Sequence, residues 1–341
     1  MNTTFEEKTI LITGATGLLG SHLVKRFLEF KNCRVIALGR NLTKLQDVFD
    51  GCEGVGKLTL MEGDVSEGVP ALEYDIDYIF HAASPIAGET IRDYPVSVIR
   101  PNILGTINIL EYLRHKKKMA GHEGCLVVFS SATVYSNTTD KDRCVSEEET
   151  SVADNLDAAN APYSESKRML EVIARSYHKQ YGLNVKIARF SYLYGYSKHA
   201  PNTAFYEFMN KTQRKENLLL NSNGAPRRDN IYVDDAIEGL LCLCEKGISG
   251  ESYNISSNGD KGNFAAIDEI AQVIASSANK NIKGNDMTVL FREKNTGRKQ
   301  GLMLNNNKLK ALGWNIQNSL EEGIEKTLKK YLSSNPVPKN E

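Results

Sequence analysis

A glycine-rich turn near the N-terminus is the feature that most restricts the fold of this chain. The segment Gly14-Ala-Thr-Gly17-Leu-Leu-Gly20 directly follows an apolar run at 9–13 and opens a helical segment at 18–29. Glycines between a strand and a helix permit a tight turn and close approach of a pyrophosphate, whose charge the amides of the helix N-terminus stabilise. At the start of a βαβ unit this arrangement predicts dinucleotide binding, with contacts from Gly14, Thr16, Gly17, Leu18, Leu19 and Gly20.

The rest of the first half alternates short apolar strands with helices. Strands are predicted at 9–13, 34–38, 58–61, 78–80, 125–129 and 185–189, and helices at 18–29, 96–117 and 163–181. Apolar strands separated by helices indicate an α/β doubly wound parallel sheet, which is a Rossmann domain, covered on both faces. We expect this domain over 1–190 with 229–256 returning to it, a smaller interleaved substrate lobe over 191–228 and 257–332, and a flexible tail over 333–341.

Composition narrows the possible partners and cofactors. In 341 residues, 42 Lys and Arg balance 42 Asp and Glu, so no global attraction to nucleic acid or acidic membranes is expected. The start lacks a signal-peptide pattern and no run approaches a membrane span, which predicts a cytoplasmic, soluble protein. Six cysteines and six histidines are scattered without ligand spacing, so no structural metal is expected.

The end of the second strand bears on the choice of dinucleotide. An acid there would bind the adenosine ribose and repel a 2′-phosphate, but the chain has Leu38-Gly39-Arg40-Asn41. Arg40 could bind a 2′-phosphate, which favours NADP over NAD, or it could simply be an exposed side chain before a helix. Other cofactor contacts are expected from Asp64 and Val65 after the third strand and from Ala82, Ala83 and Ser84 after the fourth.

Tyr163 and Lys167 are a candidate acid/base pair. Residues four apart share a helical face, so the Lys167 ammonium can lie beside the Tyr163 hydroxyl and favour its ionised form. An ordinary tyrosine, with a pKa near ~10, is a poor base at neutral pH. The alternative is a surface tyrosine and lysine at a spacing that any long helix contains.

Taken in order, these motifs resemble the extended short-chain dehydrogenase/reductase superfamily, in particular its NAD(P)-dependent nucleotide-sugar epimerase/dehydratase family. The resemblance covers nearly the whole chain. It is carried by Gly14-x-x-Gly17-x-x-Gly20, Asp64, His81-Ala-Ala, Asn102-Ile-Leu-Gly-Thr106, Ser130-Ser-Ala-Thr-Val-Tyr135, Tyr163-x-x-x-Lys167, Arg228-Asp-Asn-Ile-Tyr-Val-Asp-Asp235 and Leu312-Gly-Trp314.

The resemblance implies a role for each matched residue. Ser131 would hydrogen-bond the reacting sugar oxygen, Tyr163 would be the acid/base, and Lys167 would bind the nicotinamide ribose and lower the pKa of Tyr163. Asn102 would support the cofactor site. Thr133, Tyr192 and Arg228 would contact the substrate, with Arg228 at its pyrophosphate and Arg298 a second candidate there. An ion pair of Arg228 with Asp234 or Asp235 is the structural alternative.

The residues after Ser131 indicate the type of reaction. In the family, dehydratases carry an acidic pair there and decarboxylases a glutamate, whereas this chain has Ala132 and Thr133. The Ser-Ala-Thr-Val-Tyr run is similar to that of sugar 4-epimerases, which oxidise carbon 4 transiently and return hydride to the other face. We therefore expect an NAD(P)-dependent epimerase. The alternatives are a keto-sugar reductase or dehydrogenase, then a dehydratase or decarboxylase, and, in a different class, a non-catalytic NADP-sensing protein.

Some positions depart from the family pattern or remain open. Tyr192 stands where an asparagine is common, and Asn305 where an aspartate is usual, so the ligand could be an unusual nucleotide sugar or another molecule. His81, at the end of a buried strand, is expected to be structural rather than a base. The resemblance also implies a homodimer paired through the helices at 102–117 and 163–181, although apolar faces there could equally be core.

Overall fold

A computed structural model describes residues 4–54, 56–72, 74–86, 88–135, 142–149, 153–221, 224–292 and 301–334. Its largest sheet has seven strands, all parallel, in the order β3-β2-β1-β4-β5-β7-β11. These strands are β1 (Thr9–Thr13), β2 (Arg34–Gly39), β3 (Lys57–Glu62), β4 (Tyr78–His81), β5 (Cys125–Ser131), β7 (Asn184–Phe190) and β11 (Ser252–Ile255). The order reverses between β1 and β4, so the predicted doubly wound Rossmann sheet is confirmed.

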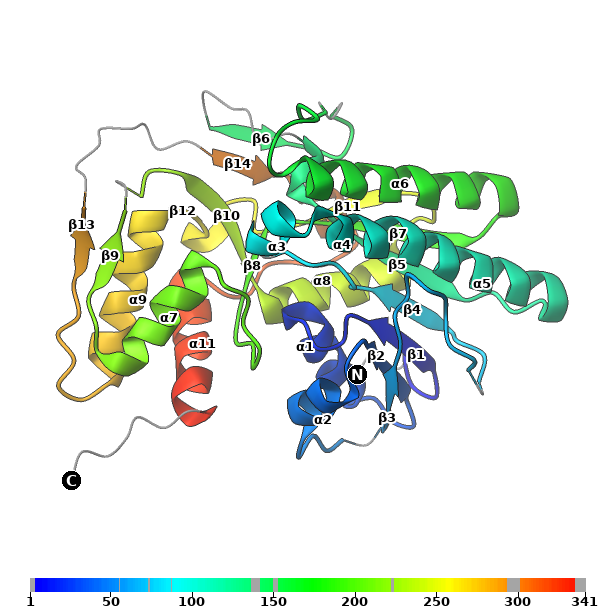
Figure 1. The fold of residues 1–341 in the computed structure, drawn as a ribbon, viewed down its shortest axis with the longest axis horizontal. Helices are drawn as coiled ribbons and strands as arrows, with labels where there is room; N and C mark the ends of the chain where they lie inside the picture. The colour runs from blue at the N-terminus through cyan, green and yellow to red at the C-terminus, as the bar shows by residue number, and fades with distance from the viewer. Residues whose placement is uncertain are drawn as a thin grey trace.

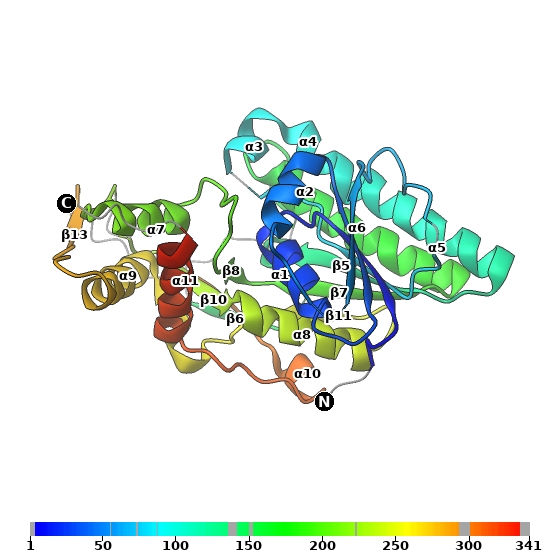
Figure 2. The same ribbon diagram turned by 90° about the horizontal axis from the view of Figure 1, so that it is seen from below.

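Helices cover both faces of this sheet, as Figures 1 and 2 show. One face packs on α1 (Leu18–Phe27), α2 (Leu42–Phe49) and α8 (Val233–Lys246), and the other on α5 (Thr106–Ala120) and α6 (Ala161–Tyr181). Alternate residues of β5 serve the two cores: Val127 joins the cluster with α1 and α8, and Leu126 joins the cluster with α5 and α6. Burial on both faces explains why the strands lack a polar alternation.

The helix predicted at 96–117 is interrupted in the structure. α3 (Gly88–Asp93) and α4 (Pro95–Arg100) are followed by a π-helical turn (Pro101–Gly105), and only then does α5 begin. Proline has no N–H to give to the carbonyl four residues earlier, so a regular α-helix cannot pass through Pro101. In this turn the carbonyl oxygen of Pro101 accepts a 3.1 Å hydrogen bond from the ring of His81. Residues 95–120 are therefore helical throughout, as predicted for 96–117, but a π-helical turn replaces the regular α-helix at 101–105.

A second group of elements lies beside the carboxyl ends of the parallel strands, and its helices are at the left of Figures 1 and 2. Its helices are α7 (Ala204–Arg214), α9 (Ile267–Asn281) and α11 (Leu320–Ser334), and the short α10 (Asn307–Lys310) lies in Figure 2 below α8. Its strands form a sheet of β12 (Phe264–Ala266), β10 (Arg227–Tyr232), β14 (Gly301–Leu304) and β6 (Arg143–Val145), with β8 (Tyr192–Tyr194) on β10, and a pair of β9 (Leu218–Leu220) and β13 (Val289–Phe291).

The chain passes between the two groups more than once. After β10, α8 packs against α1 and β11 joins β7 at the edge of the large sheet. α11 runs to Ser334, so the first two residues of the predicted tail are helical, and residues 335–341 lie outside the described part. A cleft between the groups is thereby built from segments that are far apart in sequence.

Candidate active site

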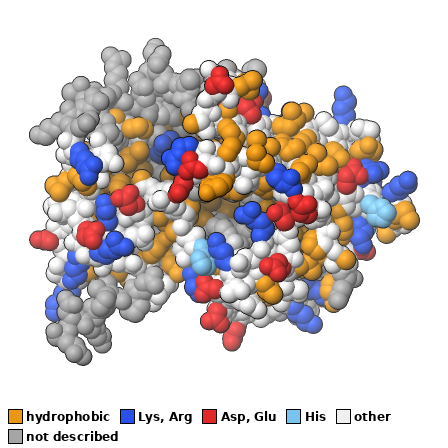
Figure 3. All heavy atoms as spheres, viewed as in Figure 1, with side chains coloured by type: hydrophobic (Ala, Val, Ile, Leu, Met, Phe, Trp, Pro, Cys, Tyr) orange, Lys and Arg blue, Asp and Glu red, His pale blue; other side chains and the backbone are white. Residues whose placement is uncertain are grey.

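A cleft of about 1410 Å³ lies at the carboxyl ends of the parallel strands. Figure 3 shows a hollow near the middle of this face, with Lys and Arg side chains around it. The cleft is lined by these predicted residues: Gly14, Thr16, Gly17, Leu18, Leu19, Gly20, Arg40, Asp64, Val65, Ala82, Ala83, Ser84, Ser131, Thr133, Tyr163, Lys167, Tyr192 and Arg228. Arg298 lies outside the described residues. The sequence motifs therefore converge on one site.

The glycine-rich turn packs against the backbone that follows β4. Gly14 has φ +64°, and a Cβ added to it would lie 2.7 Å from the carbonyl carbon of Ala82 and from the nitrogen of Ala83. A side chain at Gly14 would thus need both a left-handed backbone and space that is already filled. The turn leads into the N-terminus of α1, where amides attract an anion, so these residues fit the pyrophosphate of a dinucleotide.

The far end of the cleft is lined by Arg40 and Lys44. Arg40 is exposed at the end of β2, and the backbone of Lys44 donates a 2.7 Å hydrogen bond to the capping side chain of Asn41. The carboxylate of Asp64 accepts a 2.8 Å hydrogen bond from the nitrogen of Ser66. This end therefore offers two cationic side chains near the position where an adenosine ribose would lie.

A loop between β8 and α7 closes the same end of the cleft from the opposite side. Lys198 Nζ lies 2.8 Å from one carboxylate oxygen of Asp47 on α2, and His199 Nε2 lies 2.9 Å from the other. Lys198 also donates to the carbonyl oxygen of Asp47 at 2.7 Å. Because His199, Ala200 and Pro201 line the cleft, this contact joins its two walls.

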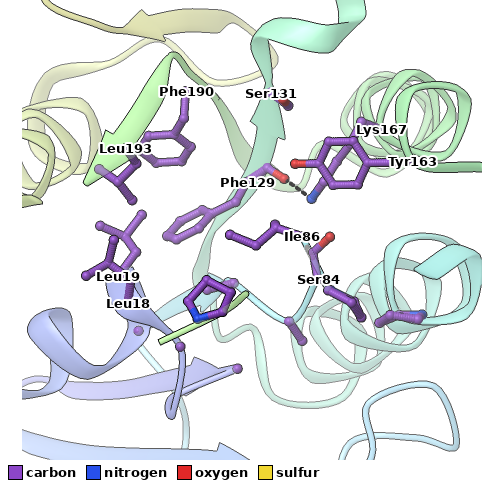
Figure 4. Close-up of a pocket in the computed structure, with 18 of the residues that line it drawn as sticks. Leu18, Leu19, Ser84, Ile86, Phe129, Ser131, Tyr163, Lys167, Phe190 and Leu193 are labelled. Atoms are coloured by element: carbon purple, nitrogen blue, oxygen red, sulfur yellow. Dashed lines mark hydrogen bonds between the residues drawn. The ribbon is translucent and has the colours of Figure 1, made fainter. Parts of the chain in front are cut away.

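Tyr163, Lys167 and Ser131 meet where β5 ends against α6 (Figure 4). Lys167 Nζ donates a 2.6 Å hydrogen bond to the carbonyl oxygen of Phe129, and it lies 5.7 Å from the centre of the Tyr163 ring. Ser131 lies on the Tyr163 side of the strand end, and its hydroxyl acts to lower the pKa of Tyr163. The helical spacing thus places the phenol and the ammonium together, and the strand brings the serine to them.

Burial dominates the electrostatics of this pair. It raises the pKa of Tyr163 above its ordinary value, while the hydrogen bond with Ser131 acts in the opposite direction. Lys167 is 3% exposed, and burial lowers its pKa to about 7, against an opposing effect of the Glu171 charge. Lys167 therefore changes charge near neutral pH. Its ability to stabilise a tyrosinate depends on the groups that stabilise its ammonium form.

His81 and Asn102 lie behind the wall of the cleft rather than on it. The two ring nitrogens of His81 contact Thr13 Oγ1 at 2.8 Å and the Pro101 carbonyl at 3.1 Å, and burial lowers the pKa of His81 to about 3. Asn102 is fully buried and donates to Ser166 Oγ at 2.9 Å. These contacts of His81 are those of a structural histidine, whereas Asn102, expected at the cofactor, is not among the described lining residues and contacts α6 through Ser166.

Arg228 and Tyr192 lie together at the substrate end. The guanidinium of Arg228 is 5.5 Å from the centre of the Tyr192 ring, and both side chains are exposed at the cleft. Asp234 lies 3.4 Å from His22, and the carboxylate of Asp235 accepts from the backbone at 317 and 318. Among the described residues the alternative ion pair of Arg228 is therefore not formed.

The sequence reasoning predicted Ser84 and Thr133 at the wall but missed Ser191, Tyr206 and several apolar side chains. Four buried hydroxyls of the wall have no hydrogen-bond partner among the described residues, those of Ser84, Thr133, Ser191 and Tyr206. Buried polar groups are normally paired, so these hydroxyls indicate a polar ligand. Apolar side chains also line this end, and Figure 4 labels Ile86, Phe129, Phe190 and Leu193 among them. Ser191 and Leu193 flank Tyr192 in sequence, which was the available signal.

Carboxylates are scarce at the reacting end. Of the described residues that line the cleft, only Asp64 and Asp229 are acidic. Burial raises the pKa of Asp229 to about 6, and its oxygens accept from Ser257 and from the nitrogen of Leu304 at 2.9 Å. Asp229 thus links β10 to β14 and to the loop after β11, and Tyr163 remains the acid/base candidate beside Ser131.

Within the described ranges, no helix has the length and apolar character that crossing a bilayer requires. In the same part of the chain, no three His, Cys, Asp or Glu side chains gather as metal ligands would.

Comparison with known proteins gives a consistent result. The sequence model described as NAD dependent epimerase/dehydratase family matches residues 10–256. UDP-glucuronic acid decarboxylase 5 of Arabidopsis thaliana is 27% identical over 319 residues, which are 92% of this chain and 86% of that protein.

Two solved structures share the fold over nearly their full length. The dTDP-glucose 4,6-dehydratase of Bacillus anthracis, in complex with NAD, has a TM-score of 0.75 at 22% identity and covers 96% of this chain and 97% of its own. The UDP-glucose 4-epimerase of Thermotoga maritima, with UDP-glucose, has a TM-score of 0.76 at 21% identity and covers 96% and 99%. These similar proteins carry out three different reactions on nucleotide sugars.

Proposed function

Because the chain belongs to the NAD-dependent epimerase/dehydratase family, a family of extended short-chain dehydrogenase/reductase enzymes, we propose that it is a nucleotide-sugar 4-epimerase. The observation that carries this proposal is the composition of the reacting end. Ala132 and Thr133 follow Ser131, and the only acidic residues among the described lining residues, Asp64 and Asp229, are hydrogen-bonded to other groups. Elimination or decarboxylation needs a further acid, whereas reversible oxidation at one carbon needs only Tyr163.

The residues present fit this chemistry. Tyr163 would take the proton of a sugar hydroxyl as its carbon is oxidised and return it when that carbon is reduced. Ser131 would orient the reacting oxygen, and protonated Lys167 would stabilise the tyrosinate. A dinucleotide held by the glycine-rich turn would supply the hydride acceptor and donor.

The substrate proposal rests on the cationic and apolar character of the other end. Arg228 is exposed at the cleft beside Tyr192, where a guanidinium can make paired hydrogen bonds to a phosphate. The similar epimerase was solved with UDP-glucose. Thr133 and Ser191 offer hydroxyls that have no partner among the described residues and could bind sugar hydroxyl groups. We infer a nucleotide sugar whose pyrophosphate faces Arg228, with Arg298 a further candidate outside the described residues.

A reductase or dehydrogenase of a keto nucleotide sugar is the second candidate. It needs the same Tyr163 and Lys167 but an exchangeable cofactor. Arg40 with Lys44 favours binding of a dinucleotide with a 2′-phosphate, and its reduced form, NADPH, would supply the hydride. This NADP preference is itself a proposal, since the family is described as NAD dependent.

The two candidates differ in what happens to the cofactor. Purified protein is mixed with a panel of UDP- and dTDP-sugars while absorbance is followed at the reduced-nicotinamide band. An epimerase converts one sugar into its 4-epimer with no net change in the band, and a reductase consumes added NADPH in proportion to product. Tyr163→Phe, which keeps the ring, should abolish turnover and still bind cofactor; full activity of that variant would refute the catalytic assignment.

We also propose a homodimer formed through α4, α5 and α6. These helices expose Val96 (63%), Met169 (49%) and Val172 (55%), and Figure 3 shows hydrophobic side chains over this region. α4 and α5 both pack on α6, so the exposed side chains belong to one helical layer. An apolar layer of this kind usually marks an interface with another protein.

A further inference from the structure

Three consecutive residues of β5 are joined to three residues spaced one turn apart on α6. The carbonyl of Phe129 accepts from Lys167 at 2.6 Å, and the Ser131 hydroxyl acts to lower the pKa of Tyr163. Between them, Ser130 Oγ donates a 2.5 Å hydrogen bond to Glu171 Oε1. The positions 163, 167 and 171 lie on one face of the helix, so Glu171 continues the line of the reacting pair into the core.

Glu171 is the centre of a buried network. It is 6% exposed and receives two hydrogen bonds from Arg189 of β7, Nε to Oε1 at 2.9 Å and a terminal nitrogen to Oε2 at 2.7 Å. Ser252 of β11 donates to Oε2 at 3.3 Å. Arg189 in turn donates to the Tyr135 hydroxyl at 2.7 Å. Glu171 thus binds α6 to three strands at the point where the site is formed.

A buried ion pair is not explained by stability alone. The desolvation of two charges can exceed their attraction, and apolar residues of similar volume often serve as well. The acid is also ionised: burial opposes this, but Arg189 holds the pKa of Glu171 below its ordinary value. A charged carboxylate is therefore maintained one turn from Lys167.

Lys167 is the group that this charge affects. Burial lowers its pKa and Glu171 acts against that effect. The other titratable or charged groups around the pair come from several elements. They are Tyr163 and Arg175 on α6, His81 on β4 and Arg189 on β7.

We propose that Glu171 is a positioning residue that keeps Lys167 protonated and fixes the end of β5 against α6. This proposal rests on the proposed function, because it concerns the same site, but its test needs no substrate. Loss of the Glu171 charge makes the ammonium harder to hold, so less of the cation is available beside Tyr163 at neutral pH.

A double-mutant cycle between Glu171 and Lys167 tests the proposal. Wild type, Glu171→Gln, Lys167→Met and the double variant are unfolded in urea near pH 6, where Lys167 is mostly charged, and near pH 9, where it is mostly neutral. We expect Glu171→Gln to lower the free energy of unfolding more when residue 167 is lysine than when it is methionine. This difference, the coupling between the two positions, should shrink clearly at the higher pH. Additive effects at both pH values would overturn the proposal.

Glu147→Gln is the matched control. Glu147 is another partly buried acid near this network, and it accepts a 2.7 Å hydrogen bond from the nitrogen of Asn254. Its loss should reduce stability without coupling to Lys167. If Glu171→Gln does not fold, Ser130→Ala removes the 2.5 Å hydrogen bond that joins β5 to Glu171 and leaves the charge in place, so unchanged stability of that variant would count against Glu171 fixing β5 on α6. Inactivity of Tyr163→Phe is scored separately, so failure here is distinct from failure of the proposed function.

Discussion

The ammonium of Lys167 donates a 2.6 Å hydrogen bond to the carbonyl oxygen of Phe129, which fixes a buried cation at the end of a strand. Burial lowers the pKa of Lys167 from 10.5 to about 7. Between these two values the unfolded chain binds more protons at this position than the folded one, so stability rises with pH across this window. Below about pH 7 the full cost of burying the charge is present.

This cost predicts that Lys167→Met stabilises the protein while it abolishes activity. The gain in melting temperature should be largest near pH 7 or below and should fade as the pH approaches the ordinary lysine value. Calorimetry of both proteins across this range measures it. A variant that is less stable than wild type at low pH would show that the ammonium is not held at a cost.

Arg40→Ser tests the choice of dinucleotide. If Arg40 binds a 2′-phosphate, the variant should lose roughly tenfold or more in affinity for NADPH and little for NADH, because a charge-assisted hydrogen bond is lost. Fluorescence titration with each cofactor gives the two dissociation constants. Arg214→Ser, an exposed arginine of α7 that does not line the cleft, is the control. Equal losses for both cofactors would contradict an NADP preference.

Asp47→Asn tests whether the β8–α7 loop retards release of the cofactor. The variant weakens the contacts with Lys198 and His199 that join the two walls, so bound NADPH should leave several times faster in a stopped-flow displacement. Added salt should speed release from wild type more than from the variant. Asp75→Asn removes another exposed Lys–Asp pair of 2.8 Å, away from the cleft, and should leave the rate unchanged. An unchanged rate in Asp47→Asn would show that this contact does not slow release of the cofactor.

Val172→Glu tests the proposed dimer. A carboxylate on the exposed face of α6 would be buried without a partner in a symmetric helical interface, so the variant should be monomeric. Light scattering should then give about 37.9 kDa in place of twice that mass. Ile248→Glu, also exposed but beyond the end of α8, should leave the mass of wild type unaltered. A wild type that is already monomeric would refute the dimer.

Much of this site could be predicted from sequence because parallel strands bring their carboxyl ends to one edge. Gly14, Arg40, Asp64, Ser84 and Ser131 each follow or end a predicted strand, so the sheet alone gathers them at one cleft. The helical spacing of Tyr163 and Lys167 then needed only the packing of α6 on β5.

Other features depend on contacts that no local pattern contains. Asp47 and Lys198 are joined across 151 residues by a loop without a motif, and Glu171 meets Arg189 only because β7 lies beside β5. Pro101 indicated an irregular turn in the helix, but the apolar periodicity on both sides favoured one regular helix. Local sequence therefore predicted the elements and their ends, while the contacts that tune the site come from the tertiary fold.

The fate of a single deuterium tests the central claim most directly. The purified protein is incubated with the nucleotide sugar that it converts, deuterated at carbon 4, and the product is analysed by mass spectrometry and NMR. Our account predicts a 4-epimer that keeps its deuterium at carbon 4, because the same hydride leaves and returns while Tyr163 moves only the proton. Transfer of the deuterium to cofactor that is then released would contradict this account. So would a keto-sugar product formed by loss of water or of carbon dioxide.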